Sequence, residues 1–434
     1  MNETLRNTGL FALVGVLIVL TGVLQSWNTA LVILNMGLVS AIMALGVNLQ
    51  WGFAGLFNVG VMGFVALGGL AAVLVSADPV PSAWAAGGGR IIGGLALGAA
   101  TVAGAMVLWK RMAAGRARLL ALLAILFVGF FAFRAVFDPG VDAVESLNAA
   151  TDGYLGGLGL PILLSWPVGG LLAAGAAWVI GKTALGLRSD YLAIATLGIA
   201  EIIIAVMKNE DWMARGVKNV IGLDRPVPYE TDLQQSDAFV ERATGLGLDP
   251  VTASGLWVKI NYGVLFAVVL VVIFVLAQLA LRSPWGRMMR AIRDNEFAAR
   301  AMGKNVTRRH LQVFILGSAV CGIAGAMMTT LDGQLTPASY QPLRFTFLIW
   351  VMVIVGGSGS NLGAVLGGLL IWFLWIQVEP MGRLAMEFLA GGLPDGSLLQ
   401  GRVIAASEHI RLLTMGVVLL VVLRFSPRGL IPEK

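Results

Sequence analysis

The amino-acid sequence predicts an all-α polytopic membrane protein with about ten to twelve crossings, including broken or re-entrant helices. Of its 434 residues, 58% are hydrophobic and only 12% are charged, whereas an average soluble domain carries about 25% charged residues. A globule of this length cannot bury so much apolar surface, and long apolar runs recur along the chain. These observations exclude a soluble enzyme.

Apolar runs of roughly 20 residues are long enough to cross about 30 Å of hydrocarbon. The first run follows Arg6 and has no small-residue cleavage site after it, so we expect a retained span and not a signal peptide. Residues 344–376 form one apolar stretch that the polar, Gly-rich segment 356–361 divides into two helical pieces. The other spans are expected at 8–26, 30–50, 56–76, 90–109, 119–137, 162–182, 191–207, 261–281, 311–331 and 408–424.

The charged residues of the connections predict an orientation. Lys and Arg gather in 110–118, in 282–310 and in the tail from Arg424, whereas 138–160 holds four acidic residues and no basic one. Cytoplasmic loops collect Lys and Arg. We therefore expect cytoplasmic N- and C-termini, a cytoplasmic loop at 282–310 and an outer loop at 208–259, within one transmembrane domain over residues 1–434.

Several kinds of chemistry have no residues to support them. The chain has one cysteine and two distant histidines, so no metal site and no cofactor is expected. Its nearest match to a phosphate-binding loop, 175–183, has one residue too many between the glycines. Basic loops account for the net charge of +6, and nucleic acid is not an expected partner. No catalytic residue is predicted, and energy for transport would come from an ion gradient or another subunit.

The basic loop contains an amphipathic segment at 283–303. Apolar residues lie on one helical face, which Glu296 interrupts, and most of the remaining surface is arginine. Such a helix could lie on anionic membrane lipid or dock on a cytoplasmic protein, and the pattern alone does not choose between them. The apolar face consists of Trp285, Met289, Ile292, Ala299 and Met302.

Four ordered blocks resemble a known family. The basic loop is similar to the cytoplasmic coupling motif of bacterial ABC-importer permeases, in the form Arg-Ala-Ile-Arg-x-x-Glu-x-Ala-Ala-Arg-x-x-Gly found in branched-chain amino-acid permeases of the LivM type. The segment 188–203 resembles the family's Arg-Gly-Asp-Tyr-Leu-Ala-Ile block. The segments 356–363 and 424–430 resemble its Gly-rich break and its terminal Arg-Pro-Arg-Gly-Leu.

The resemblance implies a permease subunit of an ATP-driven importer that moves branched-chain or related amino acids across the bacterial inner membrane. It implies four kinds of partner: a second, LivH-type permease subunit, ATP-binding cassette subunits, a periplasmic substrate-binding protein and membrane lipid. The loop 208–259 would be periplasmic, and 282–310 would be the coupling loop. The residues expected to couple transport to ATP hydrolysis are Arg290, Arg293, Asp294, Glu296, Ala298, Ala299 and Gly303.

Two departures from the family pattern widen the choice of substrate. Asn58 stands where the family has serine, and Val61 stands where it has histidine, so urea and short amides remain alternatives to amino acids. Residues 83–160 exceed the usual spacing and are expected to add an inserted pair of spans.

Polar residues within the spans are candidates for the substrate pathway. Glu201 is ionisable and lies inside an apolar span, where charge is costly, so it would also be the ion site if the chain were a self-contained secondary transporter. The alternative role of these side chains is to join helices by hydrogen bonds. The full set of pathway candidates is Asn48, Asn58, Thr196, Glu201, Gly357 and Gly359.

Overall fold

The computed structural model describes residues 3–148, 151–391, 402, 405 and 409–433. Within these residues, nine helices are long and apolar enough to cross a membrane, and Val61–Ser76 and Pro342–Gly356 are shorter apolar helices. The chain is an all-α polytopic membrane protein, as predicted. The first half contains α1 (Glu3–Leu24), α2 (Trp27–Val47), η1 (Asn48–Gly52), α3 (Val61–Ser76), α4 (Pro81–Ala83), η2 (Trp84–Gly88), α5 (Gly89–Arg111), α6 (Arg116–Glu145), η3 (Ile162–Leu164), α7 (Ser165–Ala184) and α8 (Ser189–Asn209).

The second half begins with short elements between α8 and the next long helix. These are α9 (Asp211–Ala214), η4 (Gly216–Lys218), β1 (Val220–Ile221), α10 (Glu230–Gln235) and α11 (Asp237–Gly245). The remaining elements are α12 (Pro250–Arg282), α13 (Pro284–Asp294), α14 (Glu296–Ala301), α15 (Val306–Asp332), β2 (Gln334–Leu335), η5 (Pro337–Ser339), α16 (Pro342–Gly356), α17 (Asn361–Ala390) and α19 (Ile410–Phe425).

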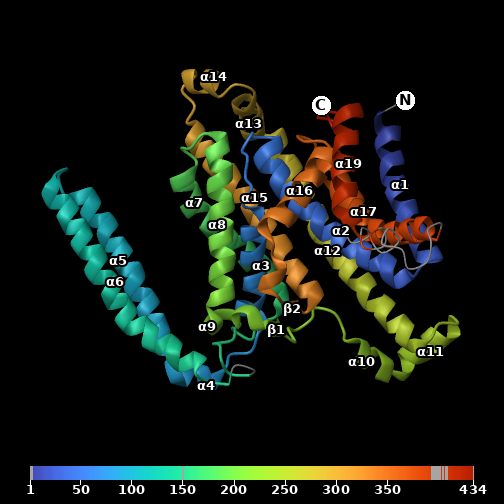
Figure 1. The fold of residues 1–434 in the computed structure, drawn as a ribbon, viewed down its shortest axis with the longest axis horizontal. Helices are drawn as coiled ribbons and strands as arrows, with labels where there is room; N and C mark the ends of the chain where they lie inside the picture. The colour runs from blue at the N-terminus through green and yellow to red at the C-terminus, as the bar shows by residue number, and fades with distance from the viewer. Residues whose placement is uncertain (1–2, 149–150, 392–401, 403–404, 406–408, 434) are drawn as a thin grey trace.

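Helices α2, α3, α7, α15, α16 and α17 form the packed centre of the molecule (Figure 1). Glycines allow their backbones to approach closely. A Cβ added to Gly325 of α15 would lie 1.9 Å from the carbonyl oxygen of Val65 in α3, and one added to Gly322 would lie 2.4 Å from that of Gly169 in α7. Small residues at such contacts permit the van der Waals packing that holds helices together in lipid.

Different elements lie at the two ends of the bundle (Figure 1). Both chain termini lie at the same end as α13 and α14, which we call the basic end, and β1, β2, α10 and α11 lie at the other (Figure 1). Strands β1 and β2 pair antiparallel, with Val220 opposite Leu335. We call this second end the ladder end. The segments predicted to be cytoplasmic therefore share one end, and those predicted to be outside share the other.

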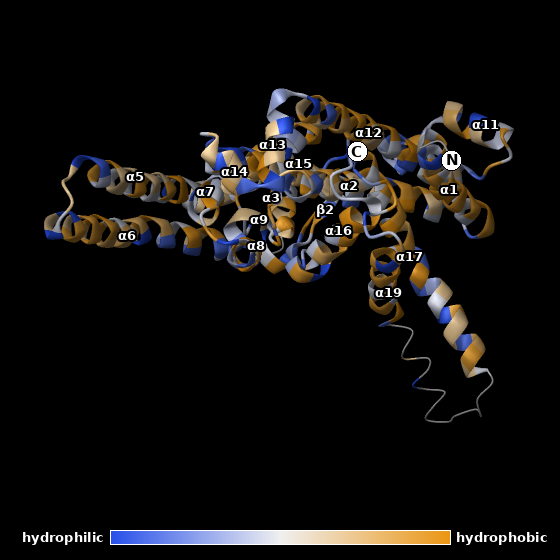
Figure 2. Cartoon of the chain, turned by 90° about the horizontal axis from the view of Figure 1, so that it is seen from above, coloured by the Kyte–Doolittle hydropathy of each residue, from blue (hydrophilic) through white to orange (hydrophobic). Residues whose placement is uncertain are grey.

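Helices α5 and α6 form an antiparallel hairpin that projects from the bundle (Figures 1 and 2). Its surface is apolar on nearly all sides, and large side chains such as Phe127, Val128 and Leu120 are exposed. A small cluster of Ala83, Ile91, Val144 and Leu155 closes its base at the ladder end. The hairpin occupies most of the segment 83–160.

Several helix boundaries differ from the predicted spans. Helix α12 begins at Pro250, well before residue 261, because Asp249 caps it by accepting a hydrogen bond from the Thr252 N–H. Helix α6 continues through Pro139 to Glu145, where Val144 joins the cluster at the base of the hairpin. Helix α3 begins at Val61 and not near residue 56, since an irregular segment precedes it.

The amphipathic segment 283–303 is two helices and not one. Asn295 has extended backbone angles and caps α14 by accepting a hydrogen bond from the Ala298 N–H at 2.9 Å. The change of direction keeps Met289 and Ile292 buried, whereas Met302 is 78% exposed. The structure therefore divides the predicted single face at Asn295: Ala299 of α14 still packs on the core, and Met302 does not.

Candidate functional site

Two interrupted helices meet near the centre of the basic half of the bundle. In the first, α2 widens into the π-helical turn η1, and an irregular segment from Phe53 to Gly60 precedes α3. In the second, α16 ends at Gly356 and α17 begins at Asn361, with Gly357 and Gly359 at φ values of +123° and +80° between them. Such φ values favour glycine. Interrupted helices beside a pathway are a recurrent feature of transporters.

Asn48 joins the two interruptions directly. Its Oδ1 accepts a hydrogen bond from the Gly359 N–H at 2.8 Å, and its Nδ2 donates to Asn361 Oδ1 at 3.1 Å. The Asn48 side chain is fully buried. It therefore supplies partners for two groups that lie about 310 positions away in sequence, and it fixes one break against the other.

Asn58 belongs to a second group of buried amides around the first break. Its Nδ2 donates to Gln50 Oε1 at 2.8 Å, and its Oδ1 accepts from the Gly60 N–H at 2.9 Å. Gln50 Nε2 in turn donates to the Phe314 carbonyl oxygen and to Ser318 Oγ on α15. These bonds satisfy the irregular backbone before α3 inside an apolar surrounding, where unpaired polar groups are costly.

Thr196 reaches the same segment from α8. Its Oγ1 accepts a hydrogen bond from the Val59 N–H at 3.1 Å and donates to the Ala193 carbonyl oxygen at 3.0 Å. From the other side, Trp350 Nε1 donates to the Asn58 carbonyl oxygen at 3.1 Å. Three of the predicted pathway residues, Asn48, Asn58 and Thr196, thus surround one irregular segment.

The C-terminal tail closes the second break. The Leu430 and Ile431 N–H groups donate to the carbonyl oxygens of Val355 and Gly356 at 2.9 and 2.8 Å. These are the last carbonyl groups of α16, which have no partner within the helix. A Cβ at Gly357 would lie 2.2 Å from the Ile431 carbonyl oxygen, so close approach of the tail also requires glycine there.

Arg293 of α13 links the basic loop to both breaks. Its Nη1 donates to the carbonyl oxygen of Gly52, the last residue of η1, and to Glu433 Oε2 of the tail at 2.7 Å. It also pairs with Asp294 at 3.2 Å. Burial lowers the pKa of Arg293, but the hydrogen bonds and charges of Glu433 and Asp294 outweigh that effect, so its pKa lies above the ordinary value. The guanidinium is a fixed positive charge against the first break.

Apart from Arg290, the other predicted coupling residues lie on or just after α13 and α14, most of them facing solvent. Glu296 pairs with Arg300 at 2.5 Å, and Ala298 and Asp294 are exposed. Gly303 ends the segment at φ +74°, and its N–H donates to the Arg300 carbonyl oxygen. Ala299 is half-buried and packs on the core. The surface also includes Phe297, which is 85% exposed and which the sequence pattern did not single out.

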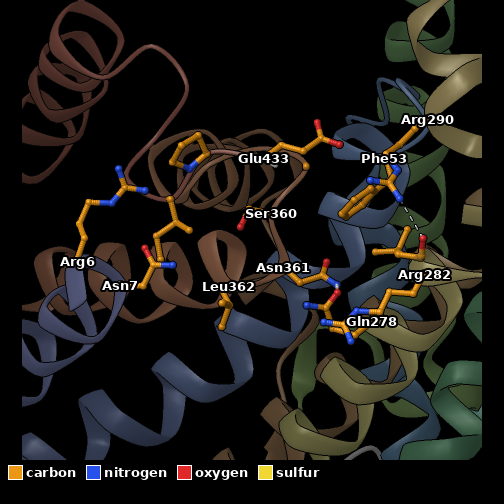
Figure 3. Close-up of a pocket in the computed structure, with 14 residues that line it drawn as sticks. Arg6, Asn7, Phe53, Gln278, Arg282, Arg290, Ser360, Asn361, Leu362 and Glu433 are labelled. Carbon is orange, nitrogen blue, oxygen red and sulfur yellow. Dashed lines mark hydrogen bonds between the residues drawn. The ribbon is translucent and has the colours of Figure 1, made fainter. Parts of the chain in front are cut away.

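A polar cleft of about 410 Å³ opens beside the second break at the basic end (Figure 3). Arg6, Arg282 and Arg290 line it, together with Glu433 and with Asn361 and Gln278, which approach one another in the close-up. Arg290 donates to the Leu281 carbonyl oxygen at 3.3 Å. The start of α17 contributes Ser360, which caps the helix by accepting from the Gly363 N–H. The cleft is therefore a water-accessible region beside Asn361, the partner of Asn48.

Glu201 lies apart from these groups. It is exposed on α8, although the neighbouring Ala200 and Ile204 are buried, and the adjacent Ile202 is 62% exposed. In the part of the chain that the structure describes, its carboxylate has no hydrogen bond or ion pair to another residue. The structure thus separates Glu201 from Asn48, Asn58 and Thr196.

Several contributors to the site were not predicted. Gln50, Ser318 and Gln278 are polar residues inside apolar spans, and that property could have identified them as readily as it identified Asn48. Glu433 could not be identified in this way. It lies in the tail, 140 positions from Arg293, and no sequence pattern connects the two.

Comparison with known proteins places the chain among transport permeases. A family model described as branched-chain amino acid transport system permease component matches residues 119–423. The LivM permease protein of the high-affinity branched-chain amino acid transport system of Escherichia coli is 29% identical over 260 residues, which cover 58% of this chain and 59% of the relative. A probable LivM protein of Methanocaldococcus jannaschii is 29% identical over 171 residues, 39% of this chain and 46% of that protein.

A more distant relative, the fructose import permease protein FrcC of Rhizobium meliloti, is 30% identical over 126 residues, which cover 28% of this chain and 34% of the relative. The chain thus spans about three fifths of the length of the E. coli relative. No solved structure matches it. Because the family model covers well over half of the sequence, the chain belongs to the family of branched-chain amino acid transport permease components.

Proposed function

We propose that this protein is the permease subunit of an ATP-driven importer that carries branched-chain or related amino acids across the bacterial inner membrane. The observation that carries the proposal is the contact of Arg293 with the Gly52 carbonyl oxygen and with Glu433. Through it, a movement of α13 and α14 reaches both interrupted helices. ATP hydrolysis by separate cassette subunits is the energy source that this arrangement fits.

The basic end supplies the surface on which those subunits would bind. Phe297 of α14 and Met302, the residue that follows this helix, are large and strongly exposed apolar side chains in a segment that also carries the charged Glu296 and Arg300. An exposed apolar pair surrounded by charge is typical of a protein interface. With the termini and this surface cytoplasmic, the ladder end would face the periplasm, where a substrate-binding protein would deliver the amino acid. A second, LivH-type permease subunit would complete the transmembrane unit.

The interrupted helices are suited to a zwitterionic substrate. Helix ends carry partial charges, positive at the start of α17 and negative at the end of α16, and both lie beside the buried amides of Asn48 and Asn361. Asn58 forms hydrogen bonds with Gln50 and with the Gly60 N–H. Asparagine in place of the family serine therefore changes the hydrogen bonds that stabilise the first break. Urea and short amides are the alternative substrates, which an uptake assay with each labelled compound distinguishes.

The test is charge reversal at Glu296. If α14 docks on an ATPase, Glu296→Lys abolishes its co-purification and ATP-dependent uptake, whereas a helix that rests on anionic lipid tolerates added positive charge. Loss of the Arg300 pair has little effect on folding, because exposed ion pairs contribute about 0–1 kcal/mol. Glu241→Lys on α11, an exposed reversal at the ladder end, is the matched control. Full recovery of the ATPase and normal uptake with Glu296→Lys would defeat the assignment.

A second arm of the test addresses a self-contained secondary transporter. Purified chain in liposomes is supplied with an ion gradient and labelled leucine, without any ATPase. The importer proposal predicts no uptake. If the chain alone takes up leucine and Glu201→Gln abolishes that uptake, the protein is an ion-coupled transporter and the importer proposal is wrong.

A further inference from the structure

A mostly apolar cavity to which five methionines contribute lies between the ladder end and the interrupted helices. Its volume is about 200 Å³, and α2, α3, α15, α16 and α17 all contribute to it. We call it the methionine cavity. Met62, at the start of α3, and Met352, four residues before Gly356, lie on the side of the breaks. Asp332 and Ser339 lie beside strand β2, on the side of the ladder end. The methionines are Met36, Met43, Met62, Met328 and Met352.

Polar groups in the cavity wall lack partners. Ser40 is only 3% exposed, yet its hydroxyl makes no hydrogen bond to another described side chain or backbone group. Trp372 Nε1 is buried and has no acceptor within the described chain. Asp332 is accessible to solvent and, among the described residues, makes no hydrogen bond or ion pair. Asp332, which is exposed, and the Ser40 hydroxyl are available to a ligand, whereas the Trp372 N–H is enclosed by the chain.

Asp332 is placed where negative charge accumulates. It is the last residue of α15, so its carboxylate adds to the partial negative charge at that helix end. The nearby Arg225, whose guanidinium approaches the adjacent Gly333, is already paired with Glu230 at 3.0 Å. The combination of a carboxylate and a helix C-terminus without a paired cation attracts a positive group.

The rest of the cavity fits an apolar group of small size. Methionine side chains are flexible and polarizable, and they adapt to ligands of varied shape. Ligand pockets for drug-sized molecules occupy about 300–1,000 Å³, so the methionine cavity suits something smaller. The Ser40 hydroxyl can donate a hydrogen bond to a carboxylate.

We propose that the methionine cavity binds a small molecule with a protonated amine and an apolar side chain. Asp332 holds the ammonium group, the methionines contact the side chain, and Ser40 contacts a carboxylate when one is present. This inference rests on the proposed function, because the substrate would bind in the cavity before it reaches the interrupted helices.

Binding of tritiated L-leucine to the purified full chain in lipid nanodiscs tests the proposal. Asp332→Asn should weaken binding at least tenfold, and Ser40→Leu, which fills the cavity, should abolish it. Isopentylamine, which lacks the carboxylate, should compete with leucine, whereas 4-methylpentanoate, which lacks the amine, should not. Asp237→Asn, an exposed substitution at the start of α11, is the matched control and should bind as the unaltered chain does.

Each result has a defined meaning when thermal unfolding shows that the variants are folded. Three results would overturn the assignment of a binding site to the cavity. The first is leucine binding that Asp332→Asn leaves unchanged, and the second is competition by 4-methylpentanoate but not by isopentylamine. The third is the absence of binding by the unaltered chain at millimolar leucine. ATP-driven uptake by the complete importer separates this failure from failure of the proposed function. If the unaltered importer transports leucine and the Asp332→Asn importer does so with the same KM, the binding site in the cavity is wrong and the importer proposal stands. Leucine binding without any ATP-driven uptake would overturn the importer proposal instead.

Discussion

Helices α2 and α6 are both strongly apolar, yet they have opposite surroundings. Along its most apolar stretch, 78% of the span Trp27–Gly52 is buried inside the chain, whereas none of the span Arg116–Glu145 is. The first span carries Gly37, Gly46 and the buried amides Asn35 and Asn48. The second exposes bulky residues such as Phe127 and Phe131. Hydrophobicity thus marks a crossing, and small or amide side chains mark the face that meets other helices.

The largest effect is expected where two core backbones touch. A Cβ at Gly325 would lie 1.9 Å from the Val65 carbonyl oxygen and 2.9 Å from Val65 Cα, so Gly325→Leu forces α15 away from α3. Overpacking of this kind costs about 1–3 kcal/mol or more. We expect no monodisperse protein in size-exclusion chromatography after detergent extraction.

Gly175→Leu is the matched control for this substitution, because an added Cβ at Gly175 of α7 meets nothing within 4 Å. It should elute and unfold as the unaltered chain does. Equal behaviour of the two variants would show that the approach of α15 to α3 does not set the stability of the centre.

A smaller effect is expected at the amide that joins the breaks. Asn48→Leu keeps the side-chain size but leaves the Gly359 N–H and Asn361 Oδ1 without their partner. An unsatisfied buried group costs about 1–3 kcal/mol, so the midpoint of thermal unfolding should fall by several degrees while the protein still folds. Asn209→Leu, at an exposed asparagine that bonds only to Ala205 of its own helix, is the control. An unfolding midpoint unchanged by Asn48→Leu would contradict the bridging role.

The sequence predicted the apolar helices and the second break well because both depend on local composition. The run 344–376 divides at 356–361 because glycine and serine destabilise a continuous apolar helix. The structure has α16 and α17 on either side of this segment. Asn48, Asn58 and Thr196 were identified as polar residues in apolar spans, and they do surround one irregular segment.

Other features depend on contacts between distant parts of the chain. The pairing of Arg293 with Glu433 requires the tail to fold back along α16, which no local pattern encodes. Glu201 was selected because an ionisable residue inside an apolar span is a candidate for function. That criterion does not predict which face of α8 packs against the other helices. Met302 has the helical spacing of Met289 and Ile292 but does not share their buried face, since the cap at Asn295 redirects the helix.

The smallest effect is expected from removing the hairpin of α5 and α6. Its two helices lie close together beside the base cluster, where a Cβ at Gly94 would lie 2.7 Å from Phe137 Cβ. A short Gly-Ser linker can therefore replace 95–136 and leave Ile91 in place. The deletion removes mainly surface that faces away from the packed centre. We therefore expect a folded chain whose unfolding midpoint falls by less than that of Asn48→Leu. A larger fall, or loss of folded protein, would show that the hairpin is part of the core and not an addition to it. If the shortened chain folds and still supports uptake, this would support the prediction that 83–160 is an inserted pair of spans.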